Sequence, residues 1–223
     1  MKKAIIYMVI SLLAGASGDN QHVFVLFLYG CRFRKVDVVS LRAFSGLLVA
    51  ARGQSPRKGG NTDLLCDAFA RGAEEVGGRV EKIFLADYRI DYFSEADEQR
   101  VGNRANEAED DVPMLVDKMV RADVIVLASP VYYMNITGQL KTFIDRTFGR
   151  YREMKDKEFF YLTACADPEE STADWAVNGF RGFVMCLPNP TERGMVKAIG
   201  MGRKGAVKGS RYEDEAYNLG KHI

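Results

Sequence analysis

Short apolar runs alternate with segments of helical spacing from Gly46 to the last residue of the chain. An apolar run of about four to eight residues between turn residues is typical of a buried strand, whereas apolar residues at helical spacing indicate a helix packed on one face. Five runs therefore predict strands, at residues 46–51, 79–86, 123–129, 158–164 and 194–201. The segments between and after them predict helices, at residues 62–76, 112–121, 138–148, 172–187 and 212–221.

This alternation predicts the fold class: an α/β domain with a doubly wound parallel sheet and helices on both faces. In such sheets ligands bind at the carboxyl ends of the strands, near the point where the strand order reverses. The loops after the first, third and fourth predicted strands should therefore line one site. No internal repeat or low-complexity linker interrupts residues 46–223.

The loop after the first predicted strand, "QSPRKGGNTDLL" at residues 54–65, has the residue types of an anion site. Asn61 is a good N-cap, and Thr62 adds a hydroxyl and a backbone N–H at the positive end of the next helix. Arg57 supplies a charge-assisted donor, and the two glycines let the backbone approach an anion closely. A capped turn with solvated cations would have the same pattern, because the spacing is neither a Walker loop nor GxGxxG.

The loop after the third predicted strand, in "SPVYYMNITGQLKTFIDR", brings aromatic residues to the same edge of the sheet. Tyr132 and Tyr133 follow Pro130, where the plane of an aromatic ligand could lie, and Gly138 opens the next helix. An aromatic cluster at a domain surface would look the same in the sequence.

The first 45 residues carry a net charge of +4 and the rest −3, within a total of +1. "MKKAIIYMVISLLAGA" has the outline of a secretory signal, with a cationic start, an apolar run and small residues before a cleavage point. A packed extension or a start-site artefact is favoured over export, because the remainder has the character of a cytoplasmic enzyme. We expect residues 1–45 to lie outside a domain at 46–223, with no stable membrane span; export by a Met1–Ala16 leader is the less favoured interpretation.

Composition excludes several kinds of partner and site. The near-neutral total charge gives no indication of nucleic-acid binding. The four cysteines lie far apart without a CxxC pair, and the two histidines are near opposite ends, so the spacing does not fit a zinc site. We therefore expect no metal and free thiols in a reducing compartment.

Together, "SPRKGGNTDLL" and "ADVIVLASPVYYMNITGQLKTFIDR" resemble the flavodoxin-like NADPH-dependent FMN reductases, in the branch close to the iron–sulfur flavoproteins, over residues 47–223. The resemblance implies a flavodoxin-like five-stranded sheet in the order 2-1-3-4-5, bound FMN, NADPH or NADH as co-substrate, and a homodimer. It also implies three groups of FMN-binding residues: Ser55, Arg57, Asn61 and Thr62 at the phosphate; Pro130, Val131, Tyr132 and Tyr133 beside the isoalloxazine; and Thr163, Ala164 and Cys165 at the other ring edge.

The chain departs from these relatives at two places. Gly60 stands where relatives often have a serine, so one hydroxyl contact is missing. The segment at residues 90–111 has no cysteine where the iron–sulfur relatives carry a compact cluster of them. It holds seven acids and two arginines over residues 95–111, from which we expect a solvated, mobile segment without an iron–sulfur cluster.

The resemblance implies an FMN-dependent NAD(P)H oxidoreductase. Hydride would pass from the nicotinamide to flavin N5, and electrons would pass on to a small acceptor such as a quinone, a nitroaromatic or free flavin. No catalytic side chain is expected, because the flavin carries the chemistry. Two alternatives stay open: a flavodoxin-type electron-transfer protein, and a flavodoxin-like interaction module without cofactor.

Overall fold

The computed structural model describes residues 6–9, 25–26, 44–50, 59–102 and 108–223, so Ser55 and Arg57 lie outside the described residues. The strands are β1 (Ile6–Val9), β2 (Val25–Leu26), β3 (Phe44–Ala50), β4 (Gly78–Ile83), β5 (Val124–Pro130), β6 (Glu158–Ala164) and β7 (Thr191–Ala198). The helices are α1 (Asn61–Glu75), α2 (Glu95–Gln99), α3 (Val112–Arg121), α4 (Gly138–Arg146), α5 (Glu170–Val184) and α6 (Arg211–Gly220), with 3₁₀ turns η1 (Leu85–Asp87) and η3 (Phe148–Glu153).

Parallel pairings join the strands at the centre of the protein. β3 pairs with β4 on one side and with β5 on the other, and β6 and β7 continue beyond β5. Among the described residues the sheet has seven strands where the sequence pattern predicted five, because β1 pairs with β3 and β5, and β2 pairs with β1. Both added strands come from the first 45 residues, for which an extension packed on the domain was one of the interpretations.

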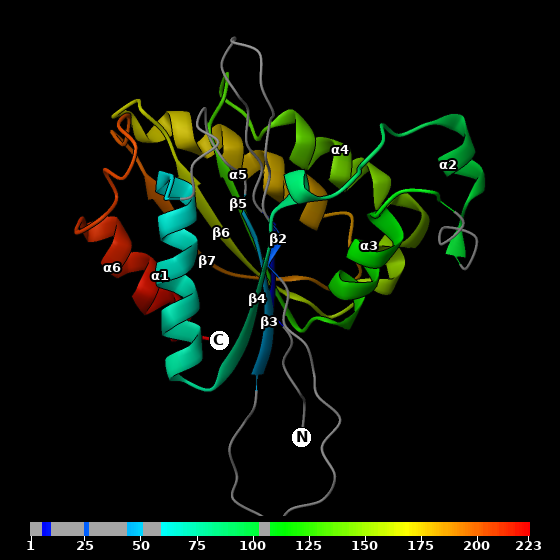
Figure 1. Ribbon diagram of the computed structural model, residues 1–223, viewed down its shortest axis with the longest axis horizontal. Helices are drawn as coiled ribbons and strands as arrows, with labels where there is room; N and C mark the ends of the chain where they lie inside the picture. Colours follow the sequence, from blue (N-terminus) through cyan, green and yellow to red (C-terminus); the bar gives the residue numbers. More distant parts are fainter. Residues whose placement is uncertain (1–5, 10–24, 27–43, 51–58, 103–107) are drawn as a thin grey trace, which may run out of the picture.

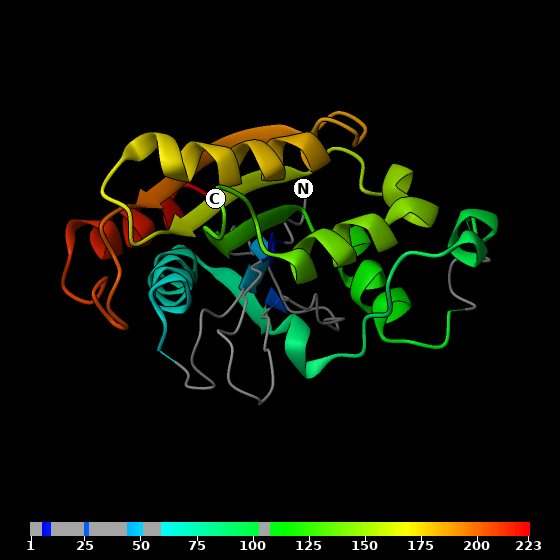
Figure 2. The ribbon, with the colours of Figure 1, turned by 90° about the horizontal axis from the view of Figure 1, so that it is seen from above.

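Helices cover both faces of the sheet, as the alternating pattern predicted. On β6, the ring of Phe160 packs edge-on against Phe69 of α1 with centroids 5.1 Å apart. The next residue, Tyr161, stacks on Phe180 of α5 at 5.4 Å. Successive residues of a strand point to opposite faces, so α1 and α5 lie on opposite sides of the sheet (Figure 2). Figure 1 shows α6 beside α1 and away from α3 and α4.

β5 is buried along its whole length, because it lies between β3 and β6 with helices over both faces. Its continuous apolar sequence follows from this position. Around it, the largest fully buried side chains are aromatic: Tyr161, Phe69, Phe143, Phe159, Phe160 and Phe180. This rigid centre fixes where the loop after Pro130 leaves the sheet.

The segment between β4 and α3 differs from the solvated stretch that its composition predicted. Asp97 accepts hydrogen bonds from the backbone N–H and the hydroxyl of Ser94 and so caps the short helix α2. Arg146, at the end of α4, forms ion pairs with Asp110 at 2.6 Å and with Asp97 at 3.2 Å. The side chain of Asp110 is only 1% exposed. The expectation of a solvated segment is therefore wrong at these two acids, because a buried arginine far along the chain neutralises them.

Candidate functional site

The loops that follow β5, β6 and β7 meet at one edge of the sheet, because parallel strands all present their carboxyl ends there. The backbone N–H of Val131 donates to the carbonyl of Ala164 at 3.1 Å, which joins the first two loops. Cys165 N–H donates to the Ala198 carbonyl at 2.9 Å, and Met201 N–H donates to the Cys165 carbonyl at 2.7 Å. These bonds make one continuous rim out of three loops.

Helix α1 begins at the same rim, and its first residue ties it to the loop after β7. The side-chain Nδ2 of Asn61 donates to the carbonyls of Met201 at 2.6 Å and Arg203 at 2.8 Å. Its Oδ1 accepts the N–H of Val207 at 3.3 Å. The prediction that Asn61 is the N-cap is wrong: Gly60 occupies that position in an extended conformation, and the asparagine amide is used to hold residues 201–207.

The start of α1 leaves room and donors for an anion. Gly59 has a φ of +91°, and a Cβ on Gly60 would meet nothing within 4 Å. The first bond inside the helix runs from Leu64 N–H to the Gly60 carbonyl at 2.9 Å. Within the described ranges, no acceptor takes the backbone N–H groups of Asn61 and Thr62, as is usual for a first turn. This donor set fits a phosphate group.

A cation that the sequence analysis missed stands at this turn. A Cβ built on Gly59 would lie 3.8 Å from Cε and 4.0 Å from Nζ of Lys204, which is an exposed residue of the loop after β7. The run "MGRKGAVKG" at residues 201–209 has the glycines and cations of a second anion-binding loop, and this was the signal that could have indicated it. The contact itself joins residues that are far apart in the sequence.

The loop after β5 presents an aromatic ring to solvent. Tyr132 and Asn135 exchange two backbone hydrogen bonds, each 3.0 Å long. The two residues between them, Tyr133 and Met134, have φ values of 46° and 61°, which is the geometry of a tight two-residue hairpin turn. Tyr133 is fully exposed. Left-handed backbone at residues other than glycine costs energy and gathers at functional sites, so this turn marks a candidate ligand contact.

Other predicted site residues lie deeper in the rim. Thr163 is fully buried, and its hydroxyl has no hydrogen-bond partner among the residues that the structure describes. Ala164 and Cys165 are each 5% exposed. Burial raises the pKa of the Cys165 thiol to about 11, and its Sγ donates to the Asp167 carbonyl at 3.3 Å. The thiol therefore stays protonated at neutral pH, which fits a small wall residue better than a redox centre.

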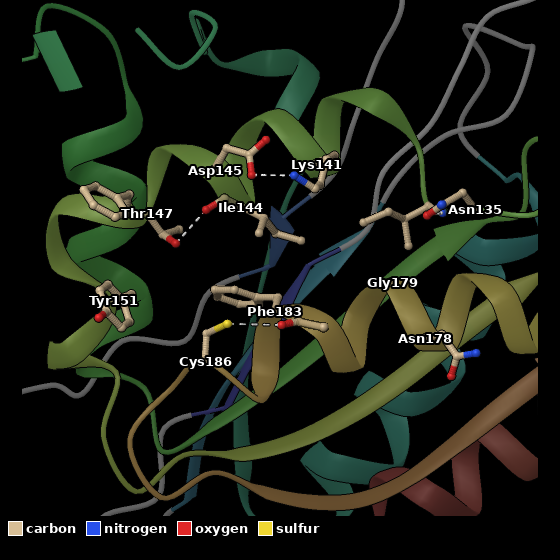
Figure 3. A pocket seen from close by; sticks show the side chains of 13 residues that line it. Asn135, Lys141, Ile144, Asp145, Thr147, Tyr151, Asn178, Gly179, Phe183 and Cys186 are labelled. Atoms are coloured by element: carbon tan, nitrogen blue, oxygen red, sulfur yellow. Dashed lines mark hydrogen bonds and ion pairs between the residues drawn. The ribbon is translucent and has the colours of Figure 1, made fainter. Parts of the chain in front are cut away.

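A hollow lies between α4 and α5, and the sequence did not predict it. It has a volume of about 770 Å³, and its apolar walls are Ile136, Ile144, Phe148, Tyr151 and Phe183 (Figure 3). Lys141 and Asp145 form an ion pair of 2.6 Å on its α4 side. Asn135 places one end of the hollow beside the loop after β5, while its other end reaches Cys186.

Among the described residues, no three His, Cys, Asp or Glu side chains form a group that could hold a metal ion. None of the described helices has the length and apolar character needed to cross a bilayer.

Comparison with known proteins assigns the chain to a family. An iron–sulfur flavoprotein of Archaeoglobus fulgidus is 36% identical over 105 residues, which are 46% of this chain and 47% of that protein. Bacillus subtilis YwqN, provisionally named an NAD(P)H-dependent FMN-containing oxidoreductase, is 27% identical over 111 residues, which are 50% of this chain and 58% of YwqN. The chain thus matches about half the length of these two relatives.

One solved structure shares the fold of this chain, and one family profile matches its sequence. The NAD(P)H:quinone oxidoreductase from Methanothermobacter marburgensis superposes with a TM-score of 0.52 at 18% identity, over 75% of this chain and 93% of that one, which shows a shared fold. The sequence profile described as NADPH-dependent FMN reductase matches residues 50–187, more than half of the chain. This protein therefore belongs to the NADPH-dependent FMN reductase family.

Proposed function

We propose that the protein is an FMN-dependent NAD(P)H oxidoreductase that reduces a small acceptor. The observation that carries the proposal is the start of α1: open glycines, first-turn N–H groups without an acceptor in the described residues, and the Lys204 ammonium beside Gly59. These donors suit a phosphate monoester, which FMN carries and riboflavin lacks. The family match supports the choice of FMN over other phosphate ligands.

The proposed FMN-binding residues divide by the part of the cofactor that they would hold. The amides of Asn61 and Thr62 would bind the phosphate, together with Ser55 and Arg57 from the loop outside the described residues. The loop from Pro130 through Val131 and Tyr132 to Tyr133 would border the isoalloxazine. Ala164 and Cys165 would form the wall at the other ring edge, with Thr163 buried behind them.

Bound FMN would supply hydride acceptance at its N5 and electron transfer to the second substrate. The protein's part is to bind and orient FMN and to shield it from solvent. The exposed ring of Tyr133 and the half-buried ring of Tyr132 would shape the acceptor pocket, which suits planar acceptors such as quinones, nitroaromatics or free flavin. The named functions of a quinone oxidoreductase and an azoreductase of similar fold support this class without identifying one acceptor.

The test is to purify the protein, record its flavin spectrum and follow NADPH oxidation with a panel of acceptors. We expect a yellow protein that binds FMN more tightly than riboflavin and oxidises NADPH when an acceptor is present. Bound FMN without NADPH oxidation would indicate an electron carrier instead. Failure to bind any flavin would indicate a module without cofactor.

Further parts of the proposal concern organisation. The parallel pairings of β4, β3, β5, β6 and β7 support the flavodoxin order for the core of the sheet. We also propose a cytoplasmic homodimer whose flavin-binding domain begins at residue 46. A shortened chain starting at Ser45 should fold and bind FMN; because β1 pairs with β3, loss of folding in that chain would overturn the boundary.

A further inference from the structure

A buried carboxylate lies in the first turn of α1, the same turn at which the proposed function places a phosphate. Asp63 is the third residue of α1 and is only 4% exposed. Its Oδ2 accepts the backbone N–H of Gly59 at 2.8 Å, which holds the glycine turn in front of the helix. A carboxylate in the first turn is favourable for a free helix, but it repels any anion bound at the same helix end.

One lysine offsets this charge from the neighbouring strand. The Nζ of Lys82, in β4, lies 2.7 Å from Oδ1 of Asp63 and 3.3 Å from the Asp63 carbonyl. It also forms an ion pair with Asp67, one turn further along α1. The Lys82 side chain is 19% exposed, so solvent screens this pair only in part.

The pKa values in this cluster support the role of Lys82 as the charge that balances Asp63. Burial lowers the pKa of Lys82, but the carboxylates of Asp63 and Asp67 outweigh that effect and raise it. Burial raises the pKa of the Cys66 thiol beside them well above its usual value. Lys82 is therefore charged at neutral pH, while Cys66 is neutral and adds no charge.

From this geometry we infer that Lys82 is a positioning residue for the FMN phosphate: by neutralising Asp63, it lets one carboxylate fix the Gly59 turn without repelling the phosphate. The inference rests on the proposed function. It assigns a role in cofactor affinity to a strand residue on the α1 side of the sheet that need not touch the flavin.

The inference predicts an order of FMN affinities that follows charge. Relative to the parent, Lys82→Met makes the cluster more negative by one unit and should weaken FMN binding about tenfold. Asp63→Asn makes the cluster less negative by one unit and keeps an oxygen that can accept the Gly59 N–H. Its FMN affinity should equal or exceed that of the parent. The double variant Asp63→Asn, Lys82→Met keeps the parent's total charge and should bind FMN within about threefold of it. Lys82→Arg should behave as the parent.

Two controls separate this effect from damage to the fold. Riboflavin lacks the phosphate, so its affinity should change by less than about twofold in every variant. Lys118→Met removes a similar ammonium, paired with Glu81 at 2.9 Å. Glu81 precedes Lys82 in β4 and so points to the other face of the sheet, away from α1. This control should leave FMN affinity unchanged.

The measurement is a fluorescence titration of each protein with FMN and riboflavin, alongside thermal unfolding. Equal weakening of both flavins in Lys82→Met, or a double variant as weak as Lys82→Met, would overturn the inference and leave the proposed function standing. A parent that binds FMN and riboflavin equally would overturn both. If Lys82→Met does not fold, Asp63→Asn and Lys82→Arg decide: weakened FMN binding in either, with riboflavin unchanged, contradicts the charge order.

Discussion

Gly72 and Gly220, on one helical face of the sheet, differ in their surroundings from Gly182 on the other face. Where α1 packs on α6, a Cβ on Gly72 would lie 1.9 Å from the carbonyl oxygen of Tyr217, and one on Gly220 would lie 2.1 Å from that of Phe69. The two backbones are in direct contact. Where α4 faces α5, a Cβ on Gly182 would meet nothing within 4 Å, and a hollow of about 770 Å³ lies beside it.

What offsets the cost of a helical glycine depends on the face of the sheet on which the glycine lies. Glycine inside a helix costs roughly 0.5–1 kcal/mol relative to alanine. On the α1 face this cost is offset by close packing, which fixes the helix that carries the proposed phosphate site. On the α4 face, the space beside Gly182 is open, so close packing at this glycine does not offset the cost. There, ion pairs of Arg146 hold the end of α4 in place.

Removing those ion pairs should have the largest effect on stability. Arg146→Met leaves the buried carboxylate of Asp110 without its partner, and breaking a buried pair in this way typically costs about 3–5 kcal/mol. Urea unfolding should show a loss of this size. Arg152→Met, which removes an exposed arginine six residues later, should change stability by less than about 0.5 kcal/mol. Equal effects in the two variants would show that the α4 face does not depend on this cluster.

A substitution that pushes α1 away from α6 should have the second largest effect on stability. Gly72→Ala places a methyl group against the Tyr217 carbonyl, and backbone cannot yield as a flexible side chain does. Overpacking of this kind costs about 1–3 kcal/mol, and we expect the upper end of that range. The readout is the unfolding midpoint in urea at constant slope. An unchanged midpoint would show that α6 moves away from α1 at little cost.

A change in the loop before α1 should affect binding and leave packing intact. Arg57→Ala removes a charge-assisted phosphate contact, typically worth about 1.5–3 kcal/mol, or a tenfold to hundredfold loss of FMN affinity. Riboflavin affinity and the unfolding midpoint should hardly change. Weakening of both flavins to the same extent, or of neither, would show that this loop is not the phosphate site.

The smallest expected effect has the opposite sign. Gly182→Ala adds a methyl group to open space and should stabilise the protein by about 0.5–1 kcal/mol, because alanine loses less conformational entropy in a helix. The same urea experiment measures it. A loss of stability as large as that of Gly72→Ala would remove the contrast between the two faces.

Local patterns predicted most of the elements, because apolar residues in helices and buried strands recur at a spacing typical of each element. The helix Val112–Arg121 and the strand Glu158–Ala164 have the predicted bounds, and α1 and α6 begin one residue earlier than predicted. β7 begins at Thr191, three residues before the predicted start, because its first residues are exposed and polar and carry no apolar signal. α2 escaped prediction because it is five residues long and buries none of them.

The sheet topology predicted which loops line the candidate site, but contacts between particular residues were predictable only where those residues are adjacent in the chain. The glycines and the start of α1 stand together in one motif, and so do Pro130 to Tyr133. The tie from Asn61 to Met201 joins residues 140 positions apart, and the pair of Lys82 with Asp63 joins a strand to a helix. Such contacts depend on how the elements pack against one another, and the spacing of apolar residues along the chain does not reveal this. For this reason Asn61 looked like a cap instead of a tether.

That tether has a consequence for synthesis on the ribosome. Chains grow at about 5–20 residues per second, so roughly 7–28 seconds pass between the appearance of Asn61 and that of Met201. Until then the amide of Asn61 lacks the carbonyls that hold it, and α6, the partner of α1, has not been made. The rim of the sheet is therefore completed late in translation, and the nascent chain should acquire flavin only after α6 has emerged.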